Sequence, residues 1–184
     1  MPRRGFTLIE MMLVVALIAI MAAMALPKIS FLRYRQDANG RLVQRTLTVA
    51  QQRALTKSTN VLFIMDYAAS RMRIVQDTNS NGAADGSESW ESWRLGEGGA
   101  RFAIPTVTVD GATAYYATGP GVSTTTAGPT ITFYPNGSAS GDAFLYIGVA
   151  TGRSDALRAI EFAGATGRTR LWRYLEGSWR RDSL

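Results

Sequence analysis

Two segments of the chain carry side chains whose types and spacing could do chemistry, and the first is an acidic loop. Residues 77–88 read Asp-Thr-Asn-Ser-Asn-Gly-Ala-Ala-Asp-Gly-Ser-Glu. This order fits the calcium-loop pattern D-x-[DN]-x-[DN]-G-x5-E, in which oxygen atoms surround the ion and a glycine makes the sharp turn. The pattern places Gly82 at the turn and predicts oxygen ligands from Asp77, Asn79, Asn81, Asp85 and Glu88.

A metal-free interpretation of the same loop is equally simple. The flanking residues are typical of a strand and a loop rather than of the two helices of an EF-hand, and only three of the five candidate ligands carry charge. An Asx-rich hairpin loop would use the same Gly and Asn residues for their backbone angles. The sequence therefore leaves Ca²⁺ open as a ligand and predicts no other cofactor.

The second segment lies near the C-terminal end and combines arginines with aromatic residues. Arg168, Arg170, Trp172 and Tyr174 alternate along a predicted strand and so share one face, and Arg173, Trp179, Arg180 and Arg181 follow. Cations for phosphates and flat rings for stacking are what a nucleic-acid contact requires. The candidate DNA-binding residues are Arg168, Arg170, Trp172 and Arg173.

The alternative for this segment is purely structural. Trp172 and Tyr174 would then face a core, and the arginines would line an exposed sheet edge and oppose aggregation.

Composition excludes much catalytic chemistry. The chain has no Cys and no His, which rules out disulfides, a thiolate nucleophile, a Cys/His zinc site and a Ser-His pair. No paired-carboxylate motif stands out either, so we expect a protein that is not an enzyme. A length of 184 residues suffices for one modest domain with an additional element.

The N-terminal part of the chain predicts a membrane span. Residues 6–26 are almost wholly apolar, and as a helix these 21 residues would measure roughly 31 Å, close to the hydrocarbon thickness of a bilayer. Arg3 and Arg4 precede the segment and favour a cytoplasmic start. A cleaved secretory signal, with Ala22, Ala23 and Ala25 as its small residues, and an ordinary signal anchor are the alternatives. Glu10 argues against both, because a carboxylate inside an apolar span usually has a function.

The remaining elements predict an α+β fold in which a long N-terminal helix packs on an antiparallel sheet. Residues 28–57 are predicted to continue as an amphipathic helix with Val43, Leu47, Ala50 and Ala54 on one face and a soft point at Asn39-Gly40. Period-two patterns predict strands at 61–66, 71–76, 101–109, 130–134, 143–149, 157–163 and 168–175. Residues 135–137 predict a turn, and residues 119–128 a long surface loop.

The N-terminal residues carry a resemblance to a known family. Gly5-Phe6-Thr7-Leu8-Ile9-Glu10 is similar to the class III signal of type IV prepilins and type II secretion pseudopilins. The resemblance implies that a prepilin peptidase cuts between Gly5 and Phe6 and methylates the new N-terminus. It also implies that Glu10 neutralises the α-amino group of Phe6 on a neighbouring subunit, and that Pro27 is a helix-kinking proline.

The back half resembles the GspH/FimT group of minor pseudopilins and pilins. The shared features are the Asp-x-Asn-x-Asn-Gly loop, residues 131–137 and the late Thr166-Gly-Arg-Thr-Arg170. In the FimT branch a Gly-Arg-x-Arg motif is associated with DNA binding during uptake, and residues 167–170 match it. The implied organisation is a leader at 1–5, a transmembrane and filament-core helix at 6–26, a helical extension at 27–57 and a periplasmic domain at 58–184.

The sequence thus predicts a structural subunit of a type II secretion or type IV pilus filament, anchored in the inner membrane by a single span. Its expected partners are other pilin or pseudopilin subunits, the prepilin peptidase and the membrane. A DNA-binding minor pilin is the alternative, with DNA as an additional partner.

Overall fold

The computed structural model describes residues 6–25, 31–96, 99–102, 107–109, 123–125 and 128–182. The chain divides into two compact units, Met1–Phe31 and Leu32–Leu184. The first contains helix α1, Leu8–Ala25, whose side chains are exposed on every face described. Among the described residues, no helix combines the length and the apolar character needed to cross a bilayer. Gly5 and Pro27 lie outside the described residues.

Helix α2, Phe31–Lys57, organises the second unit. The predicted apolar face is confirmed, because Val43, Leu47, Ala50 and Ala54 are all buried. The predicted soft point at Asn39-Gly40 is wrong, since the helix runs through both residues without a break. A Cβ atom on Gly40 would lie 2.6 Å from Leu171 Cδ1, so this glycine marks a close approach between helix and sheet.

The strands form two antiparallel sheets, which confirms the predicted class of fold. The first sheet has the order β3-β2-β1-β6-β5, and the second has the order β10-β9-β8-β7-β4. The first comprises β1 (Asn60–Asp66), β2 (Arg71–Asp77), β3 (Trp90–Arg94), β5 (Ser123–Thr125) and β6 (Gly128–Phe133). The second comprises β4 (Ala100–Phe102), β7 (Ala143–Val149), β8 (Arg158–Ala163), β9 (Arg168–Leu175) and β10 (Ser178–Arg181).

Most predicted strands are present with nearly the predicted ends. The β1–β2 hairpin pairs Asn60 with Asp77 and Asp66 with Arg71, and β7 and β9 begin and end where the sequence pattern placed them. The predicted strand at 101–109 is shorter, because β4 ends at Phe102; residues 103–106 lie outside the described part.

Three strands were not predicted. β5 lies inside the predicted loop at 119–128, whose other residues before Gly128 are not described. β3 is an exposed edge strand, so alternation between buried and exposed residues is weak there. β10 follows a two-residue turn in which Glu176 and Gly177 both have positive φ, of 50° and 82°. Positive φ at both central residues is the geometry of a type I′ hairpin turn.

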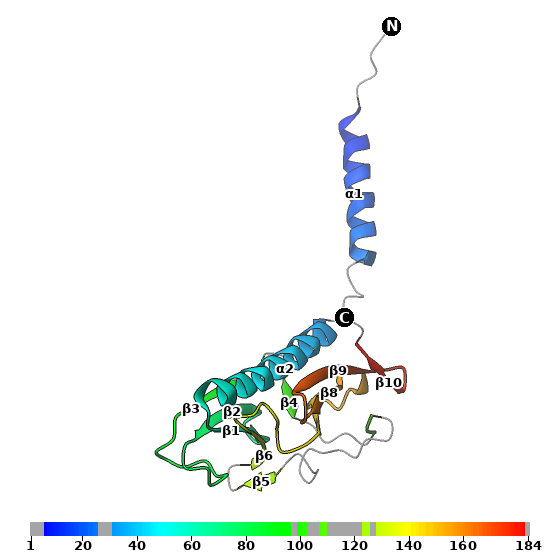
Figure 1. The fold of residues 1–184 in the computed structure, drawn as a ribbon. Helices are drawn as coiled ribbons and strands as arrows, with labels where there is room; N and C mark the ends of the chain where they lie inside the picture. Colours follow the sequence, from blue (N-terminus) through cyan, green and yellow to red (C-terminus); the bar gives the residue numbers. More distant parts are fainter. Residues whose placement is uncertain are drawn as a thin grey trace. The chain divides into compact units, whose positions relative to one another are not determined.

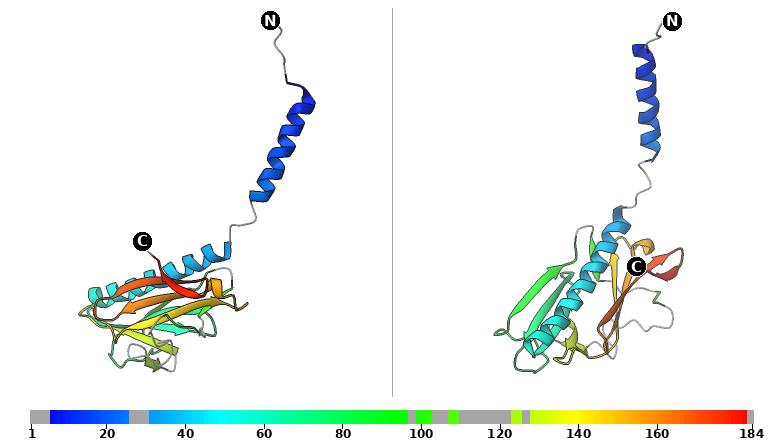
Figure 2. Two further views of the ribbon diagram at one scale, coloured as in Figure 1. Left: turned by 90° about the vertical axis from the view of Figure 1, so that its right-hand side faces the viewer. Right: turned by 45° about the horizontal axis from the view of Figure 1, so that its top comes forward.

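One core joins α2 to both sheets. It contains the four buried residues of the helix face together with inward-facing side chains of the first sheet (such as Phe63 and Phe133) and of the second (such as Leu145 and Phe162). Figure 1 shows α2 lying along the sheets, and the right-hand view of Figure 2 shows the strands of the two sheets on either side of it. A second cluster, containing Tyr146 and Trp179, covers the face of the second sheet away from the helix. The helix and strands thus position the two segments that the sequence singled out, the β2–β3 loop and strand β9 with the residues that follow it.

Candidate functional site

A buried guanidinium fixes the start of α2 on the second sheet. The side chain of Arg158, on β8, is only 1% exposed, and its Nε donates to Asp37 Oδ1 at 2.6 Å. Its Nη1 donates to the carbonyl oxygens of Asp155 and Leu157 at 3.0 and 2.7 Å, and its Nη2 donates to the carbonyl of Arg33 at 3.2 Å. A buried charge is tolerated only when it is paired and hydrogen-bonded, and this one is both.

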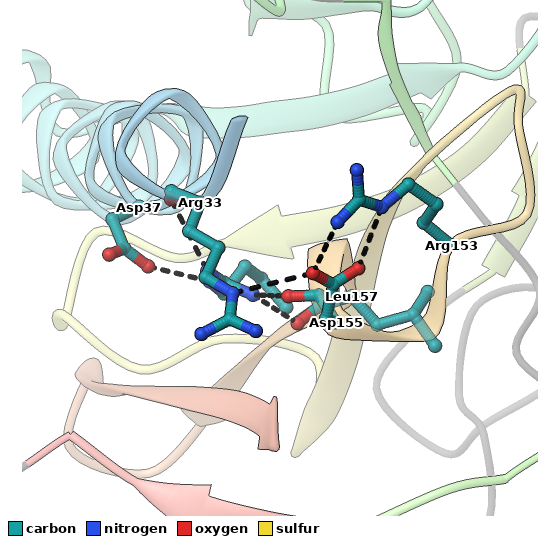
Figure 3. Close-up of polar contacts among 6 residues, drawn as sticks. Arg33, Asp37, Arg153, Asp155 and Leu157 are labelled. Carbon is teal, nitrogen blue, oxygen red and sulfur yellow. Dashed lines mark hydrogen bonds and ion pairs between the residues drawn. The ribbon is translucent and has the colours of Figure 1, made fainter. Parts of the chain in front are cut away.

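A more exposed ion-pair network surrounds this group. Figure 3 shows Arg33 and Arg153 both directed at Asp155, with Asp37 on the helix nearby. Arg153 donates to both carboxylate oxygens of Asp155, at 3.0 and 2.8 Å, and Arg33 Nε donates to Oδ2 at 3.3 Å. The hydrogen bond from Arg153 is the largest reason why the pKa of Asp155 lies below its ordinary value of 3.8, and partial desolvation opposes it. The stabilisation from this carboxylate is therefore complete above that ordinary value and is lost only as the pH falls through the lowered pKa.

The acidic loop is held together by its own backbone. Asp77 is fully buried, and its Oδ1 and Oδ2 accept hydrogen bonds from the amides of Asn81 and Gly82, both at 3.0 Å. Glu88 is 5% exposed and accepts from the amides of Thr78 at 2.9 Å and Asp85 at 3.0 Å. The two most buried carboxylates of the predicted ligand set thus already satisfy backbone donors.

The exposed members of the loop bind one another. Asn79 and Asn81 each donate from Nδ2 to Asp85 Oδ2 at 2.8 Å, and their side-chain oxygens accept from the amides of Asn81 and Ala83. Gly82 has φ of +72°, as the predicted sharp turn requires. Across the described residues, no group of three or more acidic side chains is placed to hold a metal ion. The hydrogen bonds from the loop amides to its Asn and Asp side chains are those that an Asx-rich hairpin loop makes.

The arginines and aromatic residues of β9 separate into different environments. Arg170 Nη1 and Trp172 Nε1 both donate to Glu161, each at 2.9 Å, which places them on the same face of the sheet as predicted. Tyr174 packs edge to face on Trp179 with ring centroids 5.2 Å apart, and Trp179 is 7% exposed. The aromatic rings therefore belong to the second cluster, which agrees with the structural interpretation of these residues.

The remaining arginines of this region differ sharply from one another. Arg173 lies on the helix side of β9, where it pairs with Asp37 at 3.2 Å and with Asp182 at 2.9 Å. Arg168 is exposed and makes no ion pair with any residue that the structure describes. Of the four predicted DNA-binding residues, Arg168 alone therefore keeps an uncommitted charge at the surface.

The N-terminal motif forms a capping box at the start of α1. The Glu10 amide donates to Thr7 Oγ1 at 3.3 Å, and the Thr7 amide donates in return to Glu10 Oε2 at 3.5 Å. Sequence reasoning missed this role of Glu10, although Thr-x-x-Glu before an apolar run is its ordinary signal. Phe6 is 78% exposed next to the predicted cleavage position.

Comparison with known proteins gives matches to the N-terminal motif and to the fold. Residues 1–26 match the family described as the prokaryotic N-terminal methylation motif. A crystal structure of the minor pseudopilin EpsH from the type II secretion system of Vibrio cholerae is similar to this chain at 14% identity, with a TM-score of 0.50, over 78% of this chain and 97% of that chain. A second EpsH structure gives 12% identity and a TM-score of 0.48, over 76% and 97% of the two chains. At this level of identity the likeness shows a shared fold. No curated protein gives a significant sequence match.

Removing Asp37, the partner of the buried Arg158 guanidinium, should lower the stability of the fold. We expect Asp37→Ala to lower the free energy of unfolding by about 3 kcal/mol, because it leaves the Arg158 charge buried without its counter-ion. Arg33→Ala is the matched control: it removes an exposed ion pair with Asp155 and should cost less than about 1 kcal/mol. Urea unfolding monitored by tryptophan fluorescence measures both, and equal losses would show that the buried pair has no special weight.

The acidic loop makes a prediction that separates calcium binding from backbone capping. Asp77→Ala should lower stability by about 2–3 kcal/mol whether or not calcium is present, because two backbone amides lose a charged acceptor. Asn79→Ala, at an exposed position of the same loop, should cost less. Thermal unfolding with and without added calcium is the measurement. A calcium-dependent rise in the melting temperature of the unaltered chain that Asp77→Ala abolishes would instead identify a cation site.

Proposed function

We propose that this chain is a minor pseudopilin or minor pilin, a non-catalytic subunit of a type II secretion or type IV pilus filament. The observation that carries the proposal is the combination of a methylation motif over residues 1–26 with the fold of a minor pseudopilin behind it. Either feature alone would be less specific, since the motif covers a short segment and the shared fold has low identity.

In this proposal the N-terminal segment has two successive roles. Residues 6–26 first anchor the protein in the inner membrane, with the domain in the periplasm, and then pack with other subunits in the filament. The apolar side chains of α1 are exposed on the free chain, as a segment that packs against lipid or neighbouring helices requires.

Glu10 changes partners in this sequence of events. On the free chain its carboxylate caps the helix through the Thr7 amide. Peptidase cleavage after Gly5 would create a charged amine at Phe6, and in the apolar filament this amine would need a carboxylate from a neighbouring subunit. The pair would leave neither charge unpaired in the apolar filament, and it would define the axial register.

DNA binding is the second candidate function, and one observation favours it. Arg168 is exposed and lacks an ion pair among the described residues, so its charge is available to a phosphate. The structure assigns no such freedom to Arg170, Trp172 or Arg173, which contact Glu161, Asp37 or Asp182.

Cleavage is the first test of the main proposal. Co-expression with a prepilin peptidase should yield a shorter chain that begins with a methylated Phe6, and Gly5→Leu should prevent this by altering the residue before the bond. N-terminal sequencing and mass spectrometry detect both. Glu10→Gln is the matched variant: it leaves the bond intact, so cleavage should persist while filament incorporation falls. A new N-terminus after Ala23 or Ala25 would show a secretory signal instead.

The DNA alternative has a separate test, a titration of a labelled duplex with the full chain in nonionic detergent. Arg168→Gln should weaken binding and reduce the slope of log affinity against log salt by about one, because one phosphate contact is lost. Arg101→Gln removes an equal charge at an exposed position of β4 and should change little. Absence of binding at low salt would exclude the alternative.

A further inference from the structure

Within the described part of the chain, strand β9 has an open edge along its first half. β10 pairs with β9 only from Trp172 to Leu175, and the ladder is extended by one hydrogen bond from the Asp182 amide to the Leu171 carbonyl at 2.9 Å. Among the described residues, no strand pairs with Arg168–Arg170 on this side. Because amide and carbonyl groups of alternate residues point to the same side of a strand, the direction of Leu171 places those of Thr169 at the open edge.

A groove runs beside this edge. It has a volume of about 410 Å³ and is lined by Gln44 of α2, residues 168–171 of β9, Arg181 and Asp182. Gln44 Nε2 donates to Thr169 Oγ1 at 3.4 Å, which holds the helix against the strand on one side of the groove. The edge is therefore a shaped site rather than a flat rim.

The groove carries a net positive charge among its described residues, because two of its arginines make no ion pair with a described residue. Arg181 is the cross-strand partner of Trp172, so it lies on the same face as Arg168 and Arg170. Arg168 and Arg181 are both exposed, and neither makes an ion pair with a described residue. Arg170 is balanced by Glu161, and Asp182 by Arg173. The two free guanidinium groups thus decide the sign of the local potential.

We propose that this edge binds an extended acidic segment of a neighbouring protein, which adds to the second sheet beside β9. Backbone groups of the segment would pair with the amide and carbonyl of Thr169, and its carboxylates would pair with Arg168 and Arg181. This inference goes beyond the proposed filament subunit and does not depend on it.

A peptide strand suits the site better than nucleic acid does. A peptide can pair with both the amide and the carbonyl of Thr169 and with the arginines, whereas a phosphodiester group has no N–H donor and would leave that carbonyl unpaired. The rings that could stack on bases are committed elsewhere, since Trp172 donates to Glu161 and Trp179 is 7% exposed.

The test uses the full chain in nonionic detergent and a fluorescent peptide of alternating threonine and glutamate. The peptide should bind with an affinity that falls with salt, and Arg168→Gln/Arg181→Gln should weaken it by about fivefold for each arginine removed. Arg94→Gln/Arg101→Gln removes the same charge from two other exposed strand positions and should leave binding nearly unchanged. Equal binding by both double variants would overturn the proposal.

The backbone contribution is tested at Thr169. Thr169→Pro removes the amide at the open edge without removing a β8–β9 ladder bond, so it should abolish binding, while Thr169→Ala keeps the amide and should retain it. Hydrogen exchange gives an independent measurement, in which the peptide should protect the Thr169 amide of the unaltered chain even if the proline variant misfolds. An unprotected amide, or arginine-dependent binding of an oligonucleotide but not of the peptide, would overturn the proposal in favour of a phosphate site.

Discussion

A guanidinium buried to 1% exposure cannot remain charged in the interior unless its donors are satisfied, and this need at Arg158 determines how helix and sheet meet. The side chain contacts Asp37 and the carbonyl of Arg33 on α2, and the carbonyls of Asp155 and Leu157 just before β8. The start of the helix is therefore held to the second sheet by charge-assisted hydrogen bonds. The apolar face from Val43 to Ala54 does the same for the rest of the helix by packing.

The same carboxylate extends the constraint to the C-terminal strands. Asp37 also contacts Arg173 on β9, and Arg173 contacts Asp182 beyond β10. One acidic residue in an otherwise basic helix thus connects two strands that lie far from it in the sequence and, through Arg173, the residue that follows β10. In the proposed filament subunit, any load on the N-terminal segment would enter the domain through the first turns of α2. Opening of these turns would break the hydrogen bonds of Arg158 to Asp37 and Arg33 as well as the ion pair of Arg173 with Asp37.

Much of the fold could be predicted from local patterns, and the failures have local causes too. β7 and β9 alternate clearly, so their ends were predictable, and the buried face of α2 followed from a 4-3-4 spacing. β3 is exposed and weakly alternating, so it lacked a signal. The turn at Glu176-Gly177 and the capping box at Thr7 and Glu10 do have local signals, namely a glycine in the turn and the Thr-x-x-Glu spacing. The predicted soft point at Asn39-Gly40 is wrong for a different reason. Gly40 is explained by the close approach of Leu171, a contact that no local sequence pattern contains.

The candidate sites depended more on distant residues than the fold did. Within the motif at 167–170, Arg168 and Arg170 have the same chemistry and the same strand face, yet Glu161 neutralises only Arg170. Three residues after Arg170, alternation turns Arg173 toward Asp37, 136 positions earlier in the chain, and converts a candidate ligand contact into a structural one. Spacing along a strand can assign a face, but the free charge on that face depends on which carboxylates the neighbouring strands bring to it. A four-residue motif can therefore indicate a surface without showing which of its arginines remain available to a partner.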